Sequence, residues 1–514
     1  MLSLRTTFVL LIATAGFAAI DDPVRTSGGL VSGATGSIAD VRVYKGIPYA
    51  APPVGDLRWK APKAAAPWQG VKQAAKFSPI CYQTPYGRTS IYFMEPETMS
   101  EDCLYLNVWT PAKSNKERHP VMVWIHGGAL TRGSASIPTY DGDALAKKGV
   151  VVVTINYRLN VFGFFAHPEL TKESDRNSSG NYGLLDQVAA LEWVQKNVAA
   201  FGGDPKRVTI FGESAGSWSV NYLMATPLAK GLFQGVIGES GGTFADMRKL
   251  RDAEAAGQKF ATAAGADSLQ ALRAKSAEEL LKLPSAMTAT PNVDGWMFPE
   301  DVYTIFSKGK QNDVPLLAGS NADEAKSLAP WPASGTAASF IDQSRRRFGD
   351  KTDEFLKIYP AGSNEEATAS HYASFRDFLF GWEMRTWVRA STKTGKSKAY
   401  LYYFSRVPPG PTSAQYGSYH ASEIAYVFQN LLPPRPWEDT DRKLSDAMSS
   451  YWVNFATTHD PNGKGLAKWP AYDEKTDLAL EFGDKIAPVP NLHKAALDFL
   501  DGYFAAQRAG QAAQ

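Results

Sequence analysis

The chain has 514 residues, of which 44% are hydrophobic and 21% are charged, and its formal net charge is +2. This composition is typical of a globular protein with a sizeable core and excludes a disordered or collagen-like chain. The near-neutral charge, with no Lys/Arg run longer than Arg345–Arg347, gives no indication of a nucleic-acid partner.

The N-terminus has the features of an export signal. Arg5 precedes the apolar run Phe8–Ile12, and small residues follow it up to Ala18 and Ala19. We therefore predict a signal peptide over residues 1–19, cleaved near Ala18 or Ala19, and a secreted or periplasmic protein. No other stretch approaches the ~20 uninterrupted apolar residues of a membrane span, so no stable membrane anchor is expected.

The periodicity of the chain predicts an α/β protein. Residues 30–46 alternate around Gly and Asp as a small N-terminal β-meander does. Valine and leucine recur at helical spacing over 183–201, which predicts an amphipathic helix ended by Gly202 and Gly203. Buried strands are predicted at 121–125, 150–155, 208–211, 235–237, 314–318 and 399–404. Strands that alternate with helices favour a mostly parallel central sheet with helices on both faces. No linker divides the chain, so residues 20–514 are expected to form one domain.

The segment Gly212–Gly216 fits the pattern G-x-S-x-G directly after an apolar strand. This pattern is typical of a sharp strand-to-helix turn that exposes a nucleophilic serine, here Ser214. Gly238–Gly242 fits the same pattern, but two glycines and a threonine follow Ser240, so a loop is expected there rather than a helix. Ser214 is the predicted nucleophile, and the alternative for Ser240 is an ordinary serine at a strand end.

A serine nucleophile also needs backbone donors for the oxyanion. We expect one at the N–H of Ala215 and others in the loop Gly127-Gly128-Ala129, where small residues let the backbone approach a substrate.

Chain order guides the choice of base and acid, because this fold class places the acid and then the histidine after the serine. His420 is favoured because it lies in a small-residue loop after the strand at 399–404. The other candidates are His371 in a polar helical stretch, His459 in a turn that is expected to be exposed, and His493. The acid is expected after the strand at 314–318, where the residues alone do not separate Asp323 from Glu324.

These motifs, with others along residues 29–473, resemble those of the type-B carboxylesterases, which include bacterial p-nitrobenzyl esterases and the cholinesterases. The carriers are the motifs at 44–50, 100–107, 126–128, 156–158, 180–187 and 212–216. The resemblance implies an α/β-hydrolase fold, no metal or organic cofactor, a small-molecule ester substrate and a Ser214–Glu324–His420 triad, which resolves the choice of acid.

The resemblance also assigns roles around the triad. It implies oxyanion donors at Gly128, Ala129 and Ala215, buried acids near the triad at Glu213 and Glu423, and a serine that supports the acid at Ser240. The two cysteines, Cys81 and Cys103, correspond to the first disulfide of the family, and an even count behind an export signal favours that bond over two free thiols.

Two positions depart from the family pattern. The third glycine of the usual donor loop is Ala129, and Phe93 replaces the tryptophan of the choline site, which makes choline esters poor candidates. The leading hypothesis is an exported serine carboxylesterase that forms an acyl-enzyme. Lipase or amidase activity at the same site is an alternative, and a non-catalytic adhesion protein is less favoured because every triad candidate is present.

Overall fold

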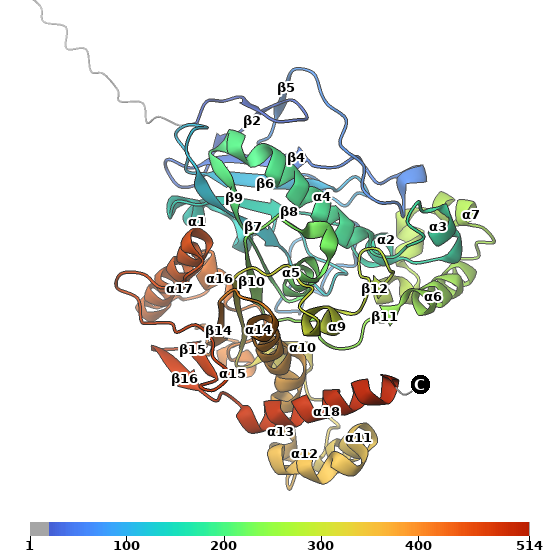
Figure 1. Cartoon of the computed structure of the whole chain (residues 1–514), viewed down its shortest axis with the longest axis vertical. Coiled ribbons are helices and arrows are strands. Elements are labelled where there is room, and N and C mark those ends of the chain that lie inside the picture. The colour runs from blue at the N-terminus through green and yellow to red at the C-terminus, as the bar shows by residue number, and fades with distance from the viewer. Residues whose placement is uncertain (1–19, 513–514) are drawn as a thin grey trace, which may run out of the picture.

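A computed structural model describes residues 20–512 (Figure 1). The predicted signal peptide lies outside the described residues. Within this range, eleven strands form the main sheet in the order β16-β15-β14-β13-β10-β9-β7-β8-β6-β4-β3. Taken in this sheet order, the strands from β15 across to β8, including β7, run parallel to one another. Antiparallel strands extend the sheet at both edges. Their bounds are β3 (Ala34–Thr35), β4 (Arg42–Pro48), β6 (Tyr105–Thr110), β7 (His119–Ile125), β8 (Val151–Ile155), β9 (Gly203–Glu213), β10 (Gly235–Glu239), β13 (Leu316–Asn321), β14 (Ala399–Phe404), β15 (Leu478–Phe482) and β16 (Ile486–Pro490).

The predicted N-terminal meander is divided between two sheets. Its first strand, β2 (Leu30–Ser32), pairs with β1 (Val24–Arg25) and β5 (Val71–Gln73), whereas β3 and β4 join the edge of the main sheet. A further pair, β11 (Arg248–Lys249) and β12 (Asn292–Val293), stands apart.

Helices cover both faces of the main sheet (Figure 1). Their bounds are α1 (Asp143–Lys147), α2 (Asn160–Phe164), α3 (Pro168–Glu173), α4 (Tyr182–Asn197), α5 (Ala215–Ala225), α6 (Leu250–Ala263), α7 (Leu269–Ala274), α8 (Ala277–Leu281), α9 (Val302–Ser307), α10 (Glu324–Leu328), α11 (Ala337–Phe348), α12 (Thr352–Ile358), α13 (Asn364–Arg376), α14 (Trp382–Thr394), α15 (Ser413–Tyr416), α16 (Ile424–Val427), α17 (Asp439–Thr458) and α18 (Lys494–Ala512). None of the helices in residues 20–512 combines the length and apolar character needed to cross a bilayer.

Side chains point alternately to the two faces of the central strands, and this divides the core into two clusters. Val121, Val123 and Ile125 of β7 face one apolar cluster, which includes residues of α4, α5 and α14. Met122 and Trp124 of the same strand face the other cluster, which includes residues of α16 and α17. Successive side chains of a strand point to opposite faces, so a continuously apolar strand fills both cores at once.

The helix predicted over 183–201 forms, but its environment differs from the expected one. It runs as α4 and continues in a 3₁₀ turn over Val198–Phe201, which ends at Gly202 with φ of 76°. Most of its residues are buried, including the polar Asp186, Gln187 and Asn197. Its exposed residues, Glu192 and Lys196, lie in the C-terminal half, so the predicted polar side is present there, whereas the N-terminal half is buried on all sides.

Candidate active site

The predicted nucleophile lies at a sharp turn between β9 and α5. Ser214 has φ of 56° and ψ of −121°, a conformation that is uncommon for a residue with a side chain. Its N–H donates to the carbonyl of Glu239 at 2.8 Å, so the neighbouring strand holds the turn. A Cβ on Gly216 would lie 2.0 Å from the carbonyl oxygen of Ile125, and one on Gly212 would lie 2.6 Å from that same oxygen. The glycines of the motif are therefore needed because the elbow packs directly against β7.

The predicted base and acid meet at the carboxyl end of the sheet. His420 Nδ1 lies 2.6 Å from Oε2 of Glu324, the first residue of α10, and both side chains are buried. The other oxygen of Glu324 accepts the N–H of Asn321 at 2.8 Å, which fixes the carboxylate. Asp323 points elsewhere, because it accepts the N–H of Ser418 at 2.9 Å and pairs with Lys326 at 2.8 Å.

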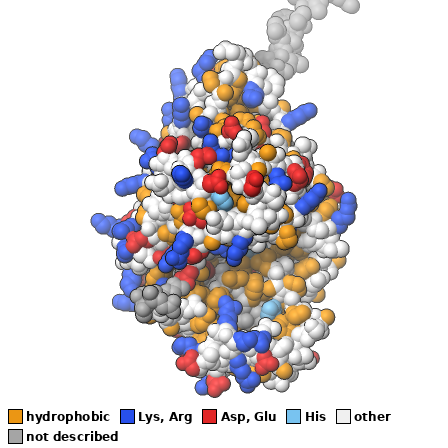
Figure 2. Space-filling view, turned by 90° about the vertical axis from the view of Figure 1, so that its right-hand side faces the viewer, with side chains coloured by type: hydrophobic (Ala, Val, Ile, Leu, Met, Phe, Trp, Pro, Cys, Tyr) orange, Lys and Arg blue, Asp and Glu red, His pale blue; other side chains and the backbone are white. Residues whose placement is uncertain are grey.

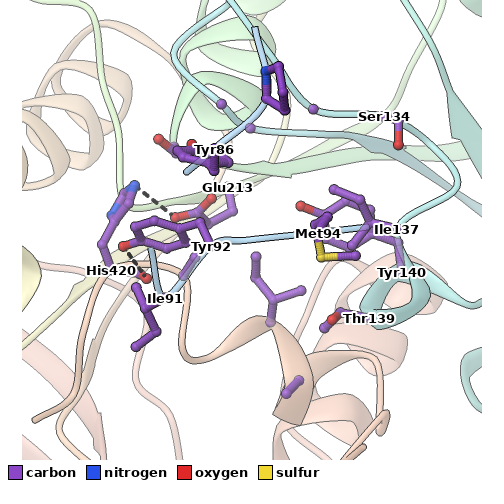
Figure 3. A pocket seen from close by; sticks show the side chains of 18 of the residues that line it. Tyr86, Ile91, Tyr92, Met94, Ser134, Ile137, Thr139, Tyr140, Glu213 and His420 are labelled. Carbon is purple, nitrogen blue, oxygen red and sulfur yellow. Dashed lines mark hydrogen bonds and ion pairs between the residues drawn. The ribbon is translucent and has the colours of Figure 1, made fainter. Parts of the chain in front are cut away.

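The second ring nitrogen of His420 faces Glu213, the residue before the predicted nucleophile. Nε2 lies 3.1 Å from Oε1 of Glu213 (Figure 3). Burial raises the pKa of Glu213 well above its ordinary value, and the nearby Glu423 and Glu324 raise it further. The carboxyl beside Nε2 is therefore held in its neutral form, because a charge there is costly in a low dielectric.

Two more buried carboxyls lie behind the triad candidates. Oε1 of Glu239 accepts the indole N–H of Trp452 at 2.7 Å, and Oε2 of Glu423 accepts the side-chain N–H of Asn321 at 2.5 Å. Burial raises the pKa of each of these glutamates to about 8. Ser240 is buried nearby with φ of 56°, and within residues 20–512 its hydroxyl makes no hydrogen bond.

The predicted donor loop follows β7. A Cβ on Gly127 would lie 3.1 Å from the Cβ of Ser214, so this loop passes beside the serine. Gly128 has φ of 104°, and a Cβ there would lie 2.2 Å from the carbonyl oxygen of Arg132. Ala129 and Leu130 have φ of 56° and 58°, so the loop keeps a left-handed backbone where the chain carries side chains. Such backbone strain clusters at functional sites.

These segments surround one cavity of about 390 Å³. Ser214, His420, Glu213 and residues 127–129 line it. Residues 82–102, here called the disulfide loop, close another side of the cavity with Tyr86, Ile91, Tyr92 and Met94 (Figure 3). The sulfurs of Cys81 and Cys103 are bonded, so the predicted disulfide is present at the base of this loop.

The wall of the cavity is largely apolar. Four of its large apolar side chains are about 40% exposed, and their gathering in one place is typical of a binding site: Met94, Met99, Leu328 and Leu432. Hydrophobic side chains also gather in a hollow on one face of the molecule (Figure 2). Phe93, which replaces the choline-site tryptophan of the cholinesterases, is half-buried and lies over the guanidinium of Arg88.

The remaining histidine candidates lie outside this arrangement. Nε2 of His371 on α13 contacts the carbonyl of Ala329 at 2.8 Å. His459 ends α17 with φ of 60° and is half-buried against Phe455, so the expectation that it is exposed was wrong. His493 packs against Tyr403.

Two aromatic neighbours of His420 were not anticipated. Phe380 lies in a π-helical turn, Asp377–Gly381, between α13 and α14, and its ring centroid is 5.0 Å from that of His420. Tyr92 contacts the backbone of His420 from the disulfide loop. Both contacts join residues that are far apart in the chain, and local sequence patterns contain no signal for such contacts.

Comparison with known proteins identifies relatives along nearly the whole chain. The model of the carboxylesterase family matches residues 21–500. The chain is 37% identical to the fumonisin B1 esterase of Sphingopyxis macrogoltabida over 491 residues, which cover 91% of this chain and 88% of that protein. It is 36% identical to the para-nitrobenzyl esterase of Bacillus subtilis over 482 residues, which cover 90% and 95%. A solved structure of a PNB esterase superposes with a TM-score of 0.81 at 34% identity and covers 92% of this chain and 99% of that one.

The resemblance to type-B carboxylesterases and the expected α/β-hydrolase fold are therefore confirmed. The serine elbow, the buried pair of His420 and Glu324 and the loop Gly127–Ala129 surround one apolar cavity in a chain with these relatives. The chain belongs to the carboxylesterase family and is a carboxylic-ester hydrolase.

Proposed function

We propose that this hydrolase cleaves esters through an acyl-enzyme on Ser214, with His420 as the base and Glu324 as the acid that orients it. The observation that supports the proposal most is the 2.6 Å contact between Glu324 and Nδ1 of His420, beside the strained serine elbow. A carboxylate at Nδ1 fixes the tautomer in which Nε2 carries the lone pair that accepts a proton.

The reaction then proceeds in two halves. Oγ of Ser214 forms a bond to the ester carbonyl carbon while its proton passes to Nε2 of His420. The carbonyl oxygen becomes negative and receives hydrogen bonds from the N–H groups of Gly128, Ala129 and Ala215. The bond to the alkoxy oxygen breaks, and the imidazolium gives its proton to the departing alcohol. A water molecule repeats the sequence on the acyl-enzyme and releases the acid.

The buried acids support this chemistry by their charge state. A neutral Glu213 contacts Nε2 without the strong charge-assisted hold that a carboxylate would exert on the imidazolium. We assign Glu423 and Ser240 a supporting role for the acid; for Glu423 the support is its contact with the side chain of Asn321, whose backbone N–H donates to Glu324. The apolar wall suits esters whose acyl or alcohol part is hydrophobic.

Replacement of each serine of the two G-x-S-x-G motifs tests the assignment. Ser214→Ala is expected to reduce hydrolysis of p-nitrophenyl acetate to background and to abolish covalent labelling by an organophosphate, because the nucleophilic oxygen is lost. The matched variant Ser240→Ala is expected to keep the label, which mass spectrometry of the tryptic peptides locates. Retained turnover in Ser214→Ala would contradict the proposal, and a label on Ser240 would reassign the nucleophile.

We also propose that the protein is exported. The sequence of residues 1–19 has the signal features, and a disulfide suits an oxidising compartment. N-terminal sequencing of protein recovered from the periplasm or medium is expected to start at Ala19 or Ile20. Recovery of the uncleaved chain from the cytoplasm alone would contradict export.

A further inference from the structure

The disulfide loop contacts both halves of the proposed catalytic machinery. Residues 82–102 contain no helix or strand in the structure. Besides the disulfide, two backbone hydrogen bonds close the base of the loop. The N–H of Ile80 donates to the carbonyl of Thr98 at 2.9 Å, and the N–H of Ser100 donates to the carbonyl of Ile80 at 2.9 Å. The loop is thus anchored at its base, and the contacts of its interior decide what it holds.

One interior contact reaches the end of the donor loop. The side-chain oxygen of Gln83 accepts the N–H of Gly133 at 2.7 Å, and its side-chain nitrogen donates to the carbonyl of Gly133 at 2.9 Å. Gly133 follows the strained residues Gly128–Leu130 at a φ of 106°. This reciprocal pair fixes the disulfide loop to the backbone segment that supplies the oxyanion donors.

The other contact reaches the base and the acid through a single phenol. The hydroxyl of Tyr92 lies 3.1 Å from the carbonyl oxygen of His420 (Figure 3). It also lies 2.7 Å from Oγ of Ser327. The phenol is the donor in both contacts, so its single proton is shared between the carbonyl oxygen of His420 and Oγ of Ser327. Burial raises the pKa of Tyr92, which keeps the phenol protonated as this donor.

Ser327 lies on α10, one helical turn after the proposed acid Glu324. The phenol therefore bridges the backbone of the base and the helix that begins with the acid. A displacement of either element would change the 2.6 Å contact between Glu324 and Nδ1, on which the tautomer of the imidazole depends.

We propose that Tyr92 is a positioning residue of the hydrolase: from the disulfide loop, it holds His420 and α10 in a fixed position relative to each other. The proposal rests on the proposed function of His420 and Glu324. It assigns the disulfide loop a part in the rate of the chemical step, in addition to its place in the wall of the cavity. Tyr92 does not touch the reacting atoms, and its effect passes through His420.

Removal of the hydroxyl alone tests this role. Tyr92→Phe keeps the ring in the cavity wall and removes the bridge. We expect kcat for p-nitrophenyl acetate to fall about tenfold, the loss that one hydrogen bond worth about 1.4 kcal/mol produces. KM should stay within about twofold, because the ring that faces the substrate remains. The rate of organophosphate labelling at Ser214 should fall in parallel with kcat, since it depends on the same base. Tyr303→Phe on α9 is the matched control, and it should leave both rates unchanged.

A double-mutant cycle separates positioning from general destabilisation. If the phenol acts through Ser327 and His420, then Ser327→Ala slows turnover by itself but adds little to Tyr92→Phe. Additive losses would overturn the proposal, as would an unchanged kcat or a raised KM with normal kcat in Tyr92→Phe. A fall in kcat matched by an equal fall in the folded fraction, followed by circular dichroism, would overturn it too. Activity that survives Ser214→Ala would instead refute the proposed function itself, so the two failures are distinguishable.

Discussion

Ala129 is the residue at which the donor loop departs from the usual glycine. Its φ of 56° shows that the backbone keeps a glycine-like conformation in spite of the methyl group. The N–H of Ala129 therefore stays available as a donor in the proposed mechanism, and the loop carries no bulk towards the cavity.

This loop leads to a prediction about the alcohol side of the substrate. We expect wild-type protein to hydrolyse a tert-butyl or linalyl ester at a measurable rate, because only small side chains flank the leaving group. Ala129→Phe should lose this activity by more than it loses activity on p-nitrophenyl acetate, since the ring would occupy the space of the tertiary carbon. Paired rates on the two ester types check this. Wild type that cleaves primary-alcohol esters and leaves tertiary ones intact would show that the loop does not set this preference.

Single residues also mark the limit of what the sequence could predict. Chain order and loop position favoured His420, which contacts a buried carboxyl in the structure, but adjacent Asp323 and Glu324 were indistinguishable until the resemblance was considered. The structure separates them by backbone direction: Asp323 turns towards Ser418, and Glu324 turns inward at the start of α10. A one-residue difference in direction depends on where a helix begins, which local patterns leave uncertain by a few residues.

At the level of elements, the buried strands were predictable because a continuous apolar run needs cover on both faces. β14 has the predicted bounds, and β7 and β9 contain the predicted strands but begin earlier, at His119 and Gly203. The contacts of the disulfide loop with His420 and Gly133 were not predictable, since they join segments some 50 to 330 residues apart without a repeating pattern. The π-helical turn that brings Phe380 to the imidazole likewise depends on one extra residue in a helix, and no composition signal indicates it.

The disulfide loop yields an element-level prediction. Replacing both Cys81 and Cys103 by Ser is expected to lower the free energy of unfolding by about 3 kcal/mol, because the bond closes a segment with a sequence separation of 22. The urea midpoint of the variant, compared with that of oxidised wild type, measures the loss. Wild type incubated with a thiol reductant in urea should approach the midpoint of the variant. Equal midpoints for oxidised and double-variant protein would mean that the loop needs no covalent closure.

At the scale of the whole molecule, the buried glutamates set how stability depends on pH. Burial raises the pKa of Glu239 to about 8, whereas an exposed glutamate in the unfolded chain titrates near ~4.3. Between these values the folded state binds more protons than the unfolded state. The stability from this group is therefore full below the unfolded pKa and is lost as pH rises through about 8.

Glu239→Gln should reveal this dependence. The amide oxygen can still accept the indole N–H of Trp452, but the group no longer titrates. We expect the variant to lose stability more slowly than wild type between about pH 5 and 8, with the slopes differing by up to about 1.4 kcal/mol per pH unit. Urea unfolding across this range gives the slopes, and Glu365→Gln at an exposed helix start serves as the control. Parallel curves for Glu239→Gln and wild type would mean that Glu239 ionises alike in both states.

The contact between Gly216 and the carbonyl of Ile125 has a consequence for how such a protein can diversify. The elbow that carries Ser214 and the strand that leads into Gly127–Ala129 touch backbone to backbone, with no side chain between them. Variation at wall residues that make no hydrogen bond to these segments, unlike Gln83 and Tyr92, is therefore expected to leave the spacing of the proposed reactive groups unchanged. Over generations, a lineage with this architecture can gain activity on new esters by exchanging wall residues such as Met94 or Leu432, while the rate of its catalytic step is preserved.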